Sequence, residues 1–349
     1  MPKHTWANEM TMPAPIADEY GRMPIADIEQ GLIRVLRDEG VPTEDARITA
    51  AHLVEGTARG YIHHGVERIF EILDGFGRGT LSPAADSTQV VDAPGLAVID
   101  ARGGLGAPIA TAAMELAVKK AESAGIAAVG VVHAGHLGIL GPWAEQAAAS
   151  GQLGIVMTTT SPAVVVPGGR TAVFGTNPLA YAFPLDGTHI TVDFATASTT
   201  RGVLLDHRDR GEPLAPGMAV DEEGLPTTDP EAALRGGLLP LGGGLKGSFL
   251  NLLVSVLAGP LVGAVANHRV TGTRWMNAPP TKGDIFIAID LAQFTDPSTF
   301  IEQMRDFFAH VERDAPGFYI PGEGSRRRRR HAEQHGIPVS PRLASLLGR

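Results

Sequence analysis

Residues 96–107 read LAVIDARGGLGA, a short apolar run followed by a glycine-rich turn. A strand, a glycine turn and a helix begin a dinucleotide-binding unit when the turn carries the fingerprint G-x-G-x-x-G. Gly104 and Gly106 supply two glycines, but Ile109 stands at the third position. The acidic residue that the fingerprint expects about twenty residues further on has no convincing candidate. The stretch therefore predicts a strand, a turn and a helix without a Rossmann cofactor site.

The chain on either side of this stretch alternates between helix and strand patterns. Upstream, residues 24–77 repeat apolar side chains at three- and four-residue steps, which predicts helices. Downstream, a helix from Pro108 to about Ser123 precedes a buried strand from Ile126, and a short helix over 142–150 precedes another strand. Further short strands, separated by Pro/Gly turns without helices, favour antiparallel pairing: 171–175, 179–184 and 189–195.

The chain after residue 205 differs from the earlier part in composition and in its apolar pattern. Residues 206–240 are rich in Gly, Pro and Asp and read as a long ordered excursion. The apolar run 249–266 is long enough to be tested as a membrane span, but Asn, Ser and Gly-Pro interrupt it and no basic cluster flanks it. We expect a buried helix there that ends near Gly259-Pro260. A late strand is predicted at 284–290, and an amphipathic helix from Phe300.

Composition excludes several classes of protein. The 349 residues are 44% hydrophobic and 19% charged, as is usual for a soluble globular protein, and the net charge of -9 disfavours nucleic acid and anionic membranes as partners. Arg326–Arg330 is a run of five arginines, which we interpret as a solvated or inter-subunit helix face. The absence of cysteine excludes disulfides and thiolate metal sites. Residues 1–23 lack the apolar core of a signal peptide, so we expect an extended arm and a cytoplasmic protein.

Histidines form the most conspicuous candidate chemistry. His64 and Arg68 lie four residues apart, which on a helix places an imidazole and a fixed cation on one face, although a solvated face would look the same. His133 and His136 form an H-x-x-H pair after a strand, where they could contact a ligand or, at that spacing, a metal. A metal-dependent hydrolase built on these histidines and His63 therefore stays open as an alternative.

Two further polar residues stand in apolar or glycine-rich surroundings. Asp193 ends an apolar strand, where an unpaired carboxylate is costly, so it either caps the following segment or orients a histidine. Lys246 lies in LGGGLKGSF, which is not a phosphate loop because it lacks G-K-[ST], but a lysine among glycines can still reach an anionic ligand.

Taken in order, the motifs of this chain resemble the malate/L-lactate dehydrogenase family of the non-Rossmann type. That family also contains sulfolactate, ureidoglycolate and diketogulonate enzymes and imino-acid reductases. The resemblance extends from about Ile25 to Gly348. The motifs that carry it are HHGVERI (63–69), VVHAGHLG (131–138), MTTTSP (157–162), PGG (167–169), FGTNPLAYAFP (174–184), VDFATAS (192–198), LKG (245–247), PGEG (321–324) and GIPVS (336–340).

The resemblance implies an oxidoreductase that transfers a hydride between NAD or NADP and a small 2-keto or 2-hydroxy acid, and a homodimer. It implies an α/β fold in which a non-Rossmann cofactor domain, built around a largely antiparallel sheet, packs against a helical domain. On that basis we assign 1–23 to the arm, 24–100 to the first part of the helical, substrate-binding domain and 101–266 to the NAD(P)-binding domain. Residues 267–349 would complete the helical domain.

Residue roles carry over motif by motif. The resemblance makes His64 the acid/base and Arg68 the anchor of the substrate carboxylate, with Gly65 letting the backbone come close. It places His136 beside the nicotinamide, and in some members this second histidine is the base, so the roles can be exchanged. Asp193 is counted with both the catalytic and the cofactor-binding residues. The cofactor-binding set is His136, Thr160, Ser161, Asp193, Phe194, Ala195, Thr196, Lys246, Gly247, Gly322 and Glu323. No metal is implied.

Several positions depart from the pattern of the family. His63 replaces the usual serine before His64, and Leu245 replaces the tyrosine before Lys246. His133-Ala134-Gly135 replaces a polar run, and Leu137 replaces an aromatic residue. These changes leave the substrate open, as they do the choice between NAD and NADP, and they allow a binding protein of the same fold that has lost turnover.

Overall fold

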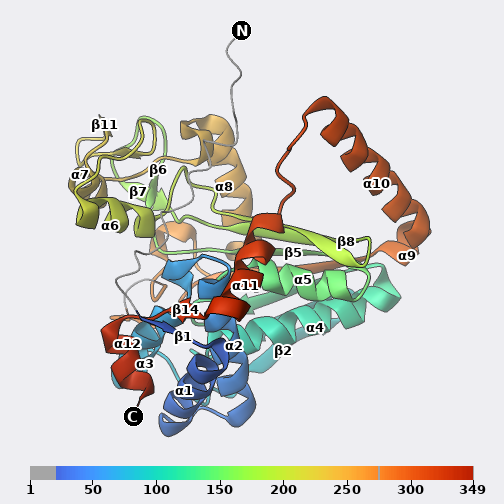
Figure 1. Ribbon diagram of the computed structural model, residues 1–349, viewed down its shortest axis with the longest axis horizontal. Coiled ribbons are helices and arrows are strands. Elements are labelled where there is room, and N and C mark those ends of the chain that lie inside the picture. The colour runs from blue at the N-terminus through green and yellow to red at the C-terminus, as the bar shows by residue number, and fades with distance from the viewer. Residues whose placement is uncertain (1–20, 274–275, 349) are drawn as a thin grey trace.

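A seven-stranded mixed sheet forms the centre of the computed structural model, which describes residues 21–273 and 276–348 (Figure 1). Its neighbouring strands are antiparallel except β3 and β4, which run parallel. The α/β class is thereby confirmed, and antiparallel pairing dominates the sheet. In spatial order the strands are β2 (Thr88–Ala93), β3 (Leu96–Asp100), β4 (Ile126–Val132), β13 (Gly283–Asp290), β5 (Gln152–Thr158), β8 (Leu179–Leu185) and β9 (Thr188–Phe194).

The glycine turn that follows β3 packs against another loop of the protein. It leads into α4 (Gly106–Ala124), as predicted. A Cβ atom on Gly106 would lie 2.2 Å from the carbonyl oxygen of His136, and the amide of Gly135 donates to the carbonyl of Gly104 at 2.8 Å. The glycines therefore admit the loop after β4, which explains why they are present without the third glycine of a dinucleotide site.

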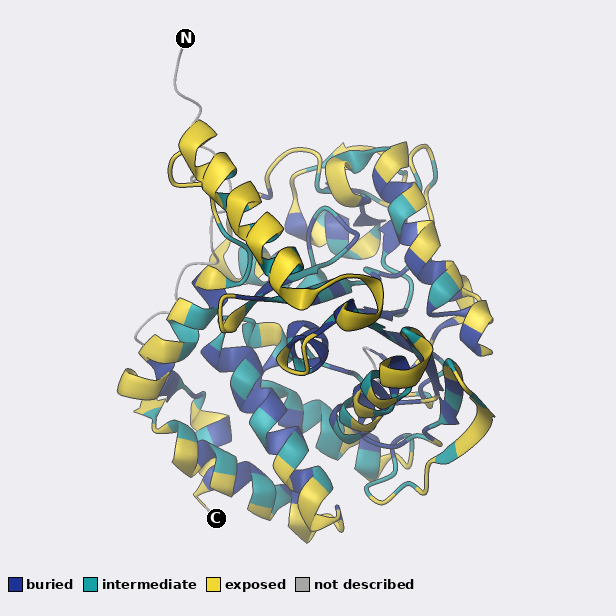
Figure 2. Cartoon of the chain, turned by 90° about the vertical axis from the view of Figure 1, so that its right-hand side faces the viewer, coloured by how far each residue is buried: buried dark blue, intermediate teal, exposed yellow. Residues whose placement is uncertain are grey.

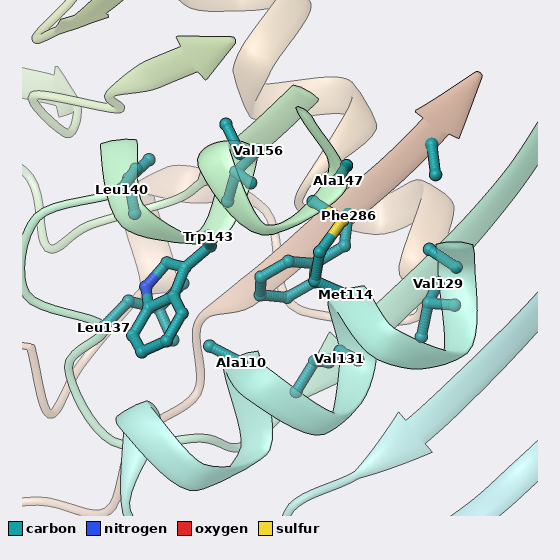
Figure 3. Close-up of a cluster of buried hydrophobic side chains, with 14 of the residues drawn as sticks. Ala110, Met114, Val129, Val131, Leu137, Leu140, Trp143, Ala147, Val156 and Phe286 are labelled. Atoms are coloured by element: carbon teal, nitrogen blue, oxygen red, sulfur yellow. The ribbon is translucent and has the colours of Figure 1, made fainter. Parts of the chain in front are cut away.

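Helices α4 and α5 (Gly141–Ala149) cover one face of the sheet and enclose the main core. Small side chains let them approach the strands closely, since a Cβ atom on Gly154 would lie 2.5 Å from the carbonyl oxygen of Ala144. Around Phe286 on β13, the helices contribute Met114 and Trp143 (Figure 3). The two predicted strand–helix units are thus packed into a single layered core.

The opposite face of the sheet packs against α8 (Leu245–Leu257) and the 3-10 turn η5 (Pro260–Val262). The expectation of a buried helix is wrong for half of α8. Val254 is fully buried, but Phe249 is 62% exposed and other apolar side chains on that face are equally open: Leu245, Leu252, Leu253 and Val256. By length and composition alone, Leu245–Val262 could cross a membrane, although 44% of it is buried, and core helices of soluble proteins pass the same test.

Helices from both ends of the chain pack together below the sheet (Figure 1). The short strand β1 (Arg22–Met23) pairs with β14 (Ile337–Pro338), and residues 1–20 of the predicted arm lie outside the described residues. The helices of this part are α1 (Ile25–Asp38), α2 (Thr43–Ala58), α3 (Ile69–Gly77), α11 (Glu323–His335) and α12 (Pro341–Leu347). The predicted boundaries at 100 and 266 do not follow the sheet, because β2, β3 and β13 pair within it.

The excursion over 206–240 is ordered: it contributes β10 (Ala219–Val220), β11 (Pro226–Thr227) and β12 (Gly237–Leu238) to a small second sheet that β6 (Val164–Val165) and β7 (Ala172–Phe174) complete. Helices α6 (Arg201–Arg210) and α7 (Pro230–Arg235) accompany this sheet, whose strands in spatial order are β11, β10, β12, β6 and β7. After β13, α9 (Leu291–Phe294) and α10 (Pro297–Asp314) run along the edge of the main sheet, and α10 is exposed along most of its length (Figure 2).

Candidate active site

The segment that carries His64 and Arg68 is not one helix, so the two side chains are not placed by the helical spacing considered from the sequence. It forms two 3-10 turns, η2 (Ile62–His64) and η3 (Val66–Arg68), separated by an extended Gly65. Close packing against α2 imposes this shape. A Cβ atom on Gly65 would lie 2.0 Å from Thr57 Oγ1, and one on Gly56 would lie 2.5 Å from the carbonyl oxygen of His64. Gly65 therefore serves the contact with α2, where the sequence analysis had assigned it to backbone approach near the substrate.

A side-chain hydrogen bond fixes the position of this turn. The hydroxyl of Thr57 accepts the amide hydrogen of Val66 at 2.9 Å, in the middle of the segment. The turn thus rests on a rigid helix rather than on a mobile loop, and this support positions both His64 and Arg68.

His64 and His136 lie face to face although they come from distant parts of the chain. Their ring centroids are 5.2 Å apart and the rings are inclined by 14°. His136 Nδ1 accepts the amide hydrogen of Gly138 at 2.8 Å, so the neutral ring carries its proton on Nε2. His64 Nδ1 is buried without a hydrogen-bond partner among the described residues.

Both imidazoles are neutral at physiological pH. Burial, with a smaller effect from the nearby Arg68 guanidinium, lowers the pKa of His64 to about 3. Burial and Arg68 also hold the pKa of His136 well below its usual value. Arg68 is thus close enough to act electrostatically on both rings, which agrees with one shared site.

A cavity of about 40 Å³ adjoins these residues. It is lined by Arg68 and His136 together with polar side chains from α2 and α3: Thr49, His52 and Glu71. Arg68 Nη2 lies 2.6 Å from Glu71 Oε2, so the guanidinium forms an ion pair inside the site. Burial raises the pKa of the Glu71 carboxyl, and the contact with Arg68 opposes that rise. Sequence analysis did not identify Thr49, His52 or Glu71.

Asp193 caps the start of α5. It does not cap the segment that follows it and binds no histidine of the described residues, which were the two roles considered from the sequence. Its Oδ2 accepts the amide hydrogens of Leu140 at 2.9 Å and Gly141 at 2.8 Å, at the start of α5. Burial raises the pKa of this carboxyl to about 6, against the effect of the two amides. These two hydrogen bonds orient the loop that follows His136 rather than a histidine ring, so Asp193 contributes to the site by holding this loop.

The four histidines considered for a metal site do not come together. His63 Nε2 lies 2.9 Å from Asp206 Oδ2, and His133 Nδ1 lies 2.9 Å from Asp100 Oδ1, away from the His64–His136 stack. Within residues 21–273 and 276–348, no group of three or more His, Asp or Glu side chains is arranged to hold a metal ion.

A buried amide network joins several of the residues assigned to the cofactor. Asn177 Oδ1 accepts the amide hydrogen of Thr160 at 3.0 Å, and its Nδ2 donates to Asn251 at 2.7 Å and also to Asn267. The hydroxyl of Thr196 donates to the carbonyl of Asn177 at 2.9 Å. The sequence indicated only a turn at Asn177, but this residue holds together the ends of β5 and β9 and the face of α8.

Ser161 and the segment after β9 extend this region. The amide of Ser161 donates to Thr273 Oγ1 at 2.8 Å, and the two hydroxyls are 2.7 Å apart. Phe194 and Ala195 are half-buried and connect Asp193 to Thr196. The loop from Thr160 and the segment up to Thr196 therefore lie side by side, as their shared assignment to a cofactor site requires.

The start of α8 lies next to this network and fits an anionic ligand. The amide of Leu241 donates to the carbonyl of Thr196 at 3.0 Å, and a Cβ atom on Gly247 would lie 2.0 Å from the carbonyl oxygen of Leu241. No side chain caps the helix at Gly244. Lys246 is exposed in the first turn and forms no ion pair with the described residues. Free helix amides beside an ammonium group suit a phosphate group.

Gly322 and Glu323 lie apart from the amide network. Gly322 has a φ of 86° and is the N-cap of α11, and a Cβ atom on it would lie 3.2 Å from the carbonyl oxygen of Thr191 on β9. Glu323 is exposed. The arginine run follows on α11 and is only partly solvated, because Arg328 donates to the carbonyl of Arg59 and Arg329 pairs with Glu55 on α2 at 2.7 Å.

Comparison with known proteins identifies the family. Residues 23–347 match the family model for malate/L-lactate dehydrogenase. A malate/(S)-sulfolactate dehydrogenase of Methanothermus fervidus is 35% identical over 316 residues, which cover 90% of this chain and 93% of that protein. A Δ1-pyrroline-2-carboxylate/Δ1-piperideine-2-carboxylate reductase of Pseudomonas putida is 33% identical over 348 residues, which cover 97% of this chain and 100% of that protein.

A solved structure supports the same assignment. The sulfolactate dehydrogenase of Methanocaldococcus jannaschii matches with a TM-score of 0.89 at 35% identity and covers 94% of this chain and 95% of that chain. The resemblance found in the ordered sequence motifs is therefore confirmed, and such membership implies a nicotinamide cofactor. The chain belongs to the malate/L-lactate dehydrogenase family and is an oxidoreductase.

Proposed function

We propose that this protein transfers a hydride between NAD(P)H and a small 2-keto acid, and catalyses the reverse oxidation of the 2-hydroxy acid. The observation that carries the proposal is that Arg68 and His136 line one small cavity, with the ring of His64 stacked on that of His136. Reduction of a keto acid needs a proton for the developing alkoxide and a fixed position for the carboxylate. Two imidazoles and one guanidinium supply these functions.

Arg68 anchors the substrate in this account. Its planar guanidinium has five N–H donors, and the ion pair with Glu71, the one that Arg68 forms with the described residues, leaves donors free for a carboxylate. The relatives named for malate, sulfolactate and pyrroline-2-carboxylate act on compounds that share a carboxylate next to the carbon that changes oxidation state. The shared carboxylate is the group that we assign to Arg68.

The two histidines have different roles in this account. Because the Gly138 amide occupies His136 Nδ1, His136 presents Nε2–H and donates a hydrogen bond that polarises the substrate oxygen. His64 has a ring nitrogen without a described partner and a neutral ring, so we assign to it the proton transfer. A neutral imidazole is ready to accept the hydroxyl proton in the direction of oxidation.

The cofactor supplies or accepts the hydride. The residues that fit it are those around the Asn177 network and the start of α8, where Lys246 and the uncapped amides would hold phosphate groups. Thr160, Ser161 and Thr196 would line the part between α8 and the histidines. A metal-dependent hydrolase is not favoured, because His63 and His133 pair with separate carboxylates and do not join His64 and His136 in one cluster.

Substitution of the two central residues tests this proposal. His64→Gln should lower kcat by about 10²-fold or more, the usual contribution of a positioned acid or base. Arg68→Lys should mainly raise the KM for the keto acid, because lysine cannot form the planar two-point contact. Fluorescence titration should show unchanged binding of NADH or NADPH in both variants. Normal turnover by both variants would refute the assignment, and cofactor binding without turnover of any keto acid by the wild type would favour the non-catalytic alternative.

We also propose a homodimer formed through the exposed apolar face of α8. This face begins beside Lys246 and includes Phe249, 62% exposed, and Leu253, 50% exposed. Contiguous apolar surface of this kind is typical of protein interfaces. Light scattering should give a dimer mass for the wild type and a monomer mass for Phe249→Asp, and an unchanged mass would contradict this interface.

A further inference from the structure

Glu71 places a negative charge in a site whose expected ligand is itself an anion. The residue lies in the first turn of α3, and its side chain lines the cavity beside Arg68. Glu71 Oε2 is buried and lies 2.6 Å from Arg68 Nη2. The only cationic side chain among the described residues of the cavity wall is therefore already paired with a carboxylate.

The remaining titratable groups around the cavity add no positive charge. Burial lowers the pKa of His52 to about 4, and His64 and His136 are neutral for the same reason. The carboxylate next to the keto carbon can share Arg68 with Glu71. A second carboxylate or a sulfonate on the same substrate would meet Glu71 without a cation of its own among the described residues, and burying an unpaired charge is costly.

The volume of the cavity strengthens this restriction. At about 40 Å³ it has room for only a few waters, each of which needs roughly 10–15 Å³. A second anionic group could not keep its full hydration shell there. The charge of the far end of the substrate therefore matters more in this pocket than it would in an open cleft.

Polar atoms of the cavity wall also indicate what the far end of the substrate offers. Thr49 Oγ1 and His52 Nε2 are buried without a hydrogen-bond partner among the described residues. His52 forms a hydrogen bond with the backbone of Leu137 that raises its pKa, so the ring is the donor in this bond. On the neutral ring, Nε2 is then the nitrogen without a proton, and it can only accept a hydrogen bond. An imidazole lone pair requires a donor, and the threonine hydroxyl can accept as well.

We infer that Glu71 determines substrate specificity: the pocket selects 2-keto acids that carry a single negative charge and a hydrogen-bond donor at the far end, and it rejects a second anionic group. This inference rests on the proposed function. The inferred substrate preference differs from that of the relatives named for malate and sulfolactate, because those two compounds each carry two anionic groups.

Two keto acids of equal chain length test the inference. Oxaloacetate ends in a carboxylate, and 4-hydroxy-2-oxobutanoate ends in a hydroxyl group. The wild type should show the higher kcat/KM with the hydroxyl compound. Glu71→Gln keeps the size of the side chain and removes its charge, so the preference should shift toward oxaloacetate by about tenfold or more, as expected for the loss of one partly buried like charge. Asp74→Asn is the matched control, because Asp74 is an exposed acid on the same helix, and it should leave the ratio unchanged.

A binding measurement that needs no turnover completes the test. The shift in melting temperature produced by malate, compared with that produced by 2,4-dihydroxybutanoate, should increase in Glu71→Gln and stay constant in Asp74→Asn. If the wild type prefers oxaloacetate, or if Glu71→Gln changes neither ratio, Glu71 does not select substrates by charge. A wild type that binds these acids with the expected preference but reduces none of them would refute the proposed function and leave the role of Glu71 in binding intact.

Discussion

Substitution of Gly65 by alanine should move the catalytic turn without removing any of its functional groups. The new Cβ atom would lie 2.0 Å from Thr57 Oγ1 and 2.8 Å from the amide nitrogen of Thr57. Ordinary contact between such atoms is about 3.5 Å, so the turn must shift away from α2 by about 1 Å or more. Overpacking of this kind costs about 1–3 kcal/mol of stability, and a displacement of about 1 Å at a catalytic group costs about 10²-fold in rate.

Steady-state kinetics and urea unfolding should be measured together on Gly65→Ala and on a matched control. Gly77→Ala is that control, because no atom lies within 4 Å of the position where its Cβ would be built at the end of α3. We expect Gly65→Ala to lose about 10²-fold in kcat/KM with 2-keto acids and Gly77→Ala to keep the wild-type value. If Gly65→Ala retained both its stability and its kcat/KM, close packing on α2 would not be what positions His64 and Arg68.

Three further predictions concern stability and cofactor binding. Burial lowers the pKa of His52 to about 4 in the folded protein, so between pH 6.5 and 4 this imidazole is protonated only in the unfolded chain. The free energy of unfolding should therefore fall as pH falls through this range. In urea unfolding, His52→Phe should reduce the stability lost between pH 7 and 5 by about 2 kcal/mol. Arg59 contacts both carboxylate oxygens of buried Glu145, at 2.6 and 2.7 Å. Glu145→Gln should lower the free energy of unfolding by about 3 kcal/mol, whereas Glu44→Gln, which breaks an exposed ion pair, should cause no measurable change. Equal effects of the two substitutions would contradict the role of burial. Lys246→Gln should weaken NADH or NADPH binding by about tenfold or more in a fluorescence titration without altering stability, and unchanged affinity would place the phosphates elsewhere.

Periodicity along the chain was sufficient to predict most helices and strands, because their apolar patterns are local. It did not show the break between His64 and Arg68, where the chain forms two 3-10 turns because Gly56 and Gly65 face each other across two segments. Only the contact between those segments shows that a helix would clash. Conversely, the failed fingerprint around Gly104 and Gly106 was informative, since those glycines accommodate the loop that carries His136.

The candidate site was predicted in part. Ordered motifs located His64, Arg68 and His136, which the structure brings together. Glu71 was not identified, because a single acid on a predicted helix is indistinguishable from a solvated residue until α2, α3 and the loop at 135–138 enclose a cavity around it. At Asn177 the sequence indicated only a turn, because the residues that this side chain binds, Asn251 and Asn267, are distant in sequence.

The central claim is that this chain moves a hydride between a nicotinamide ring and the carbon next to a carboxylate held by Arg68. The most direct measurement uses reduced nicotinamide cofactor with deuterium at the transferable position, a 2-keto acid and mass spectrometry of the product. With the wild type we expect a 2-hydroxy acid that carries one deuterium on carbon 2, and with His64→Gln we expect little product. A product without deuterium, or equal yields from the two proteins, would contradict this claim.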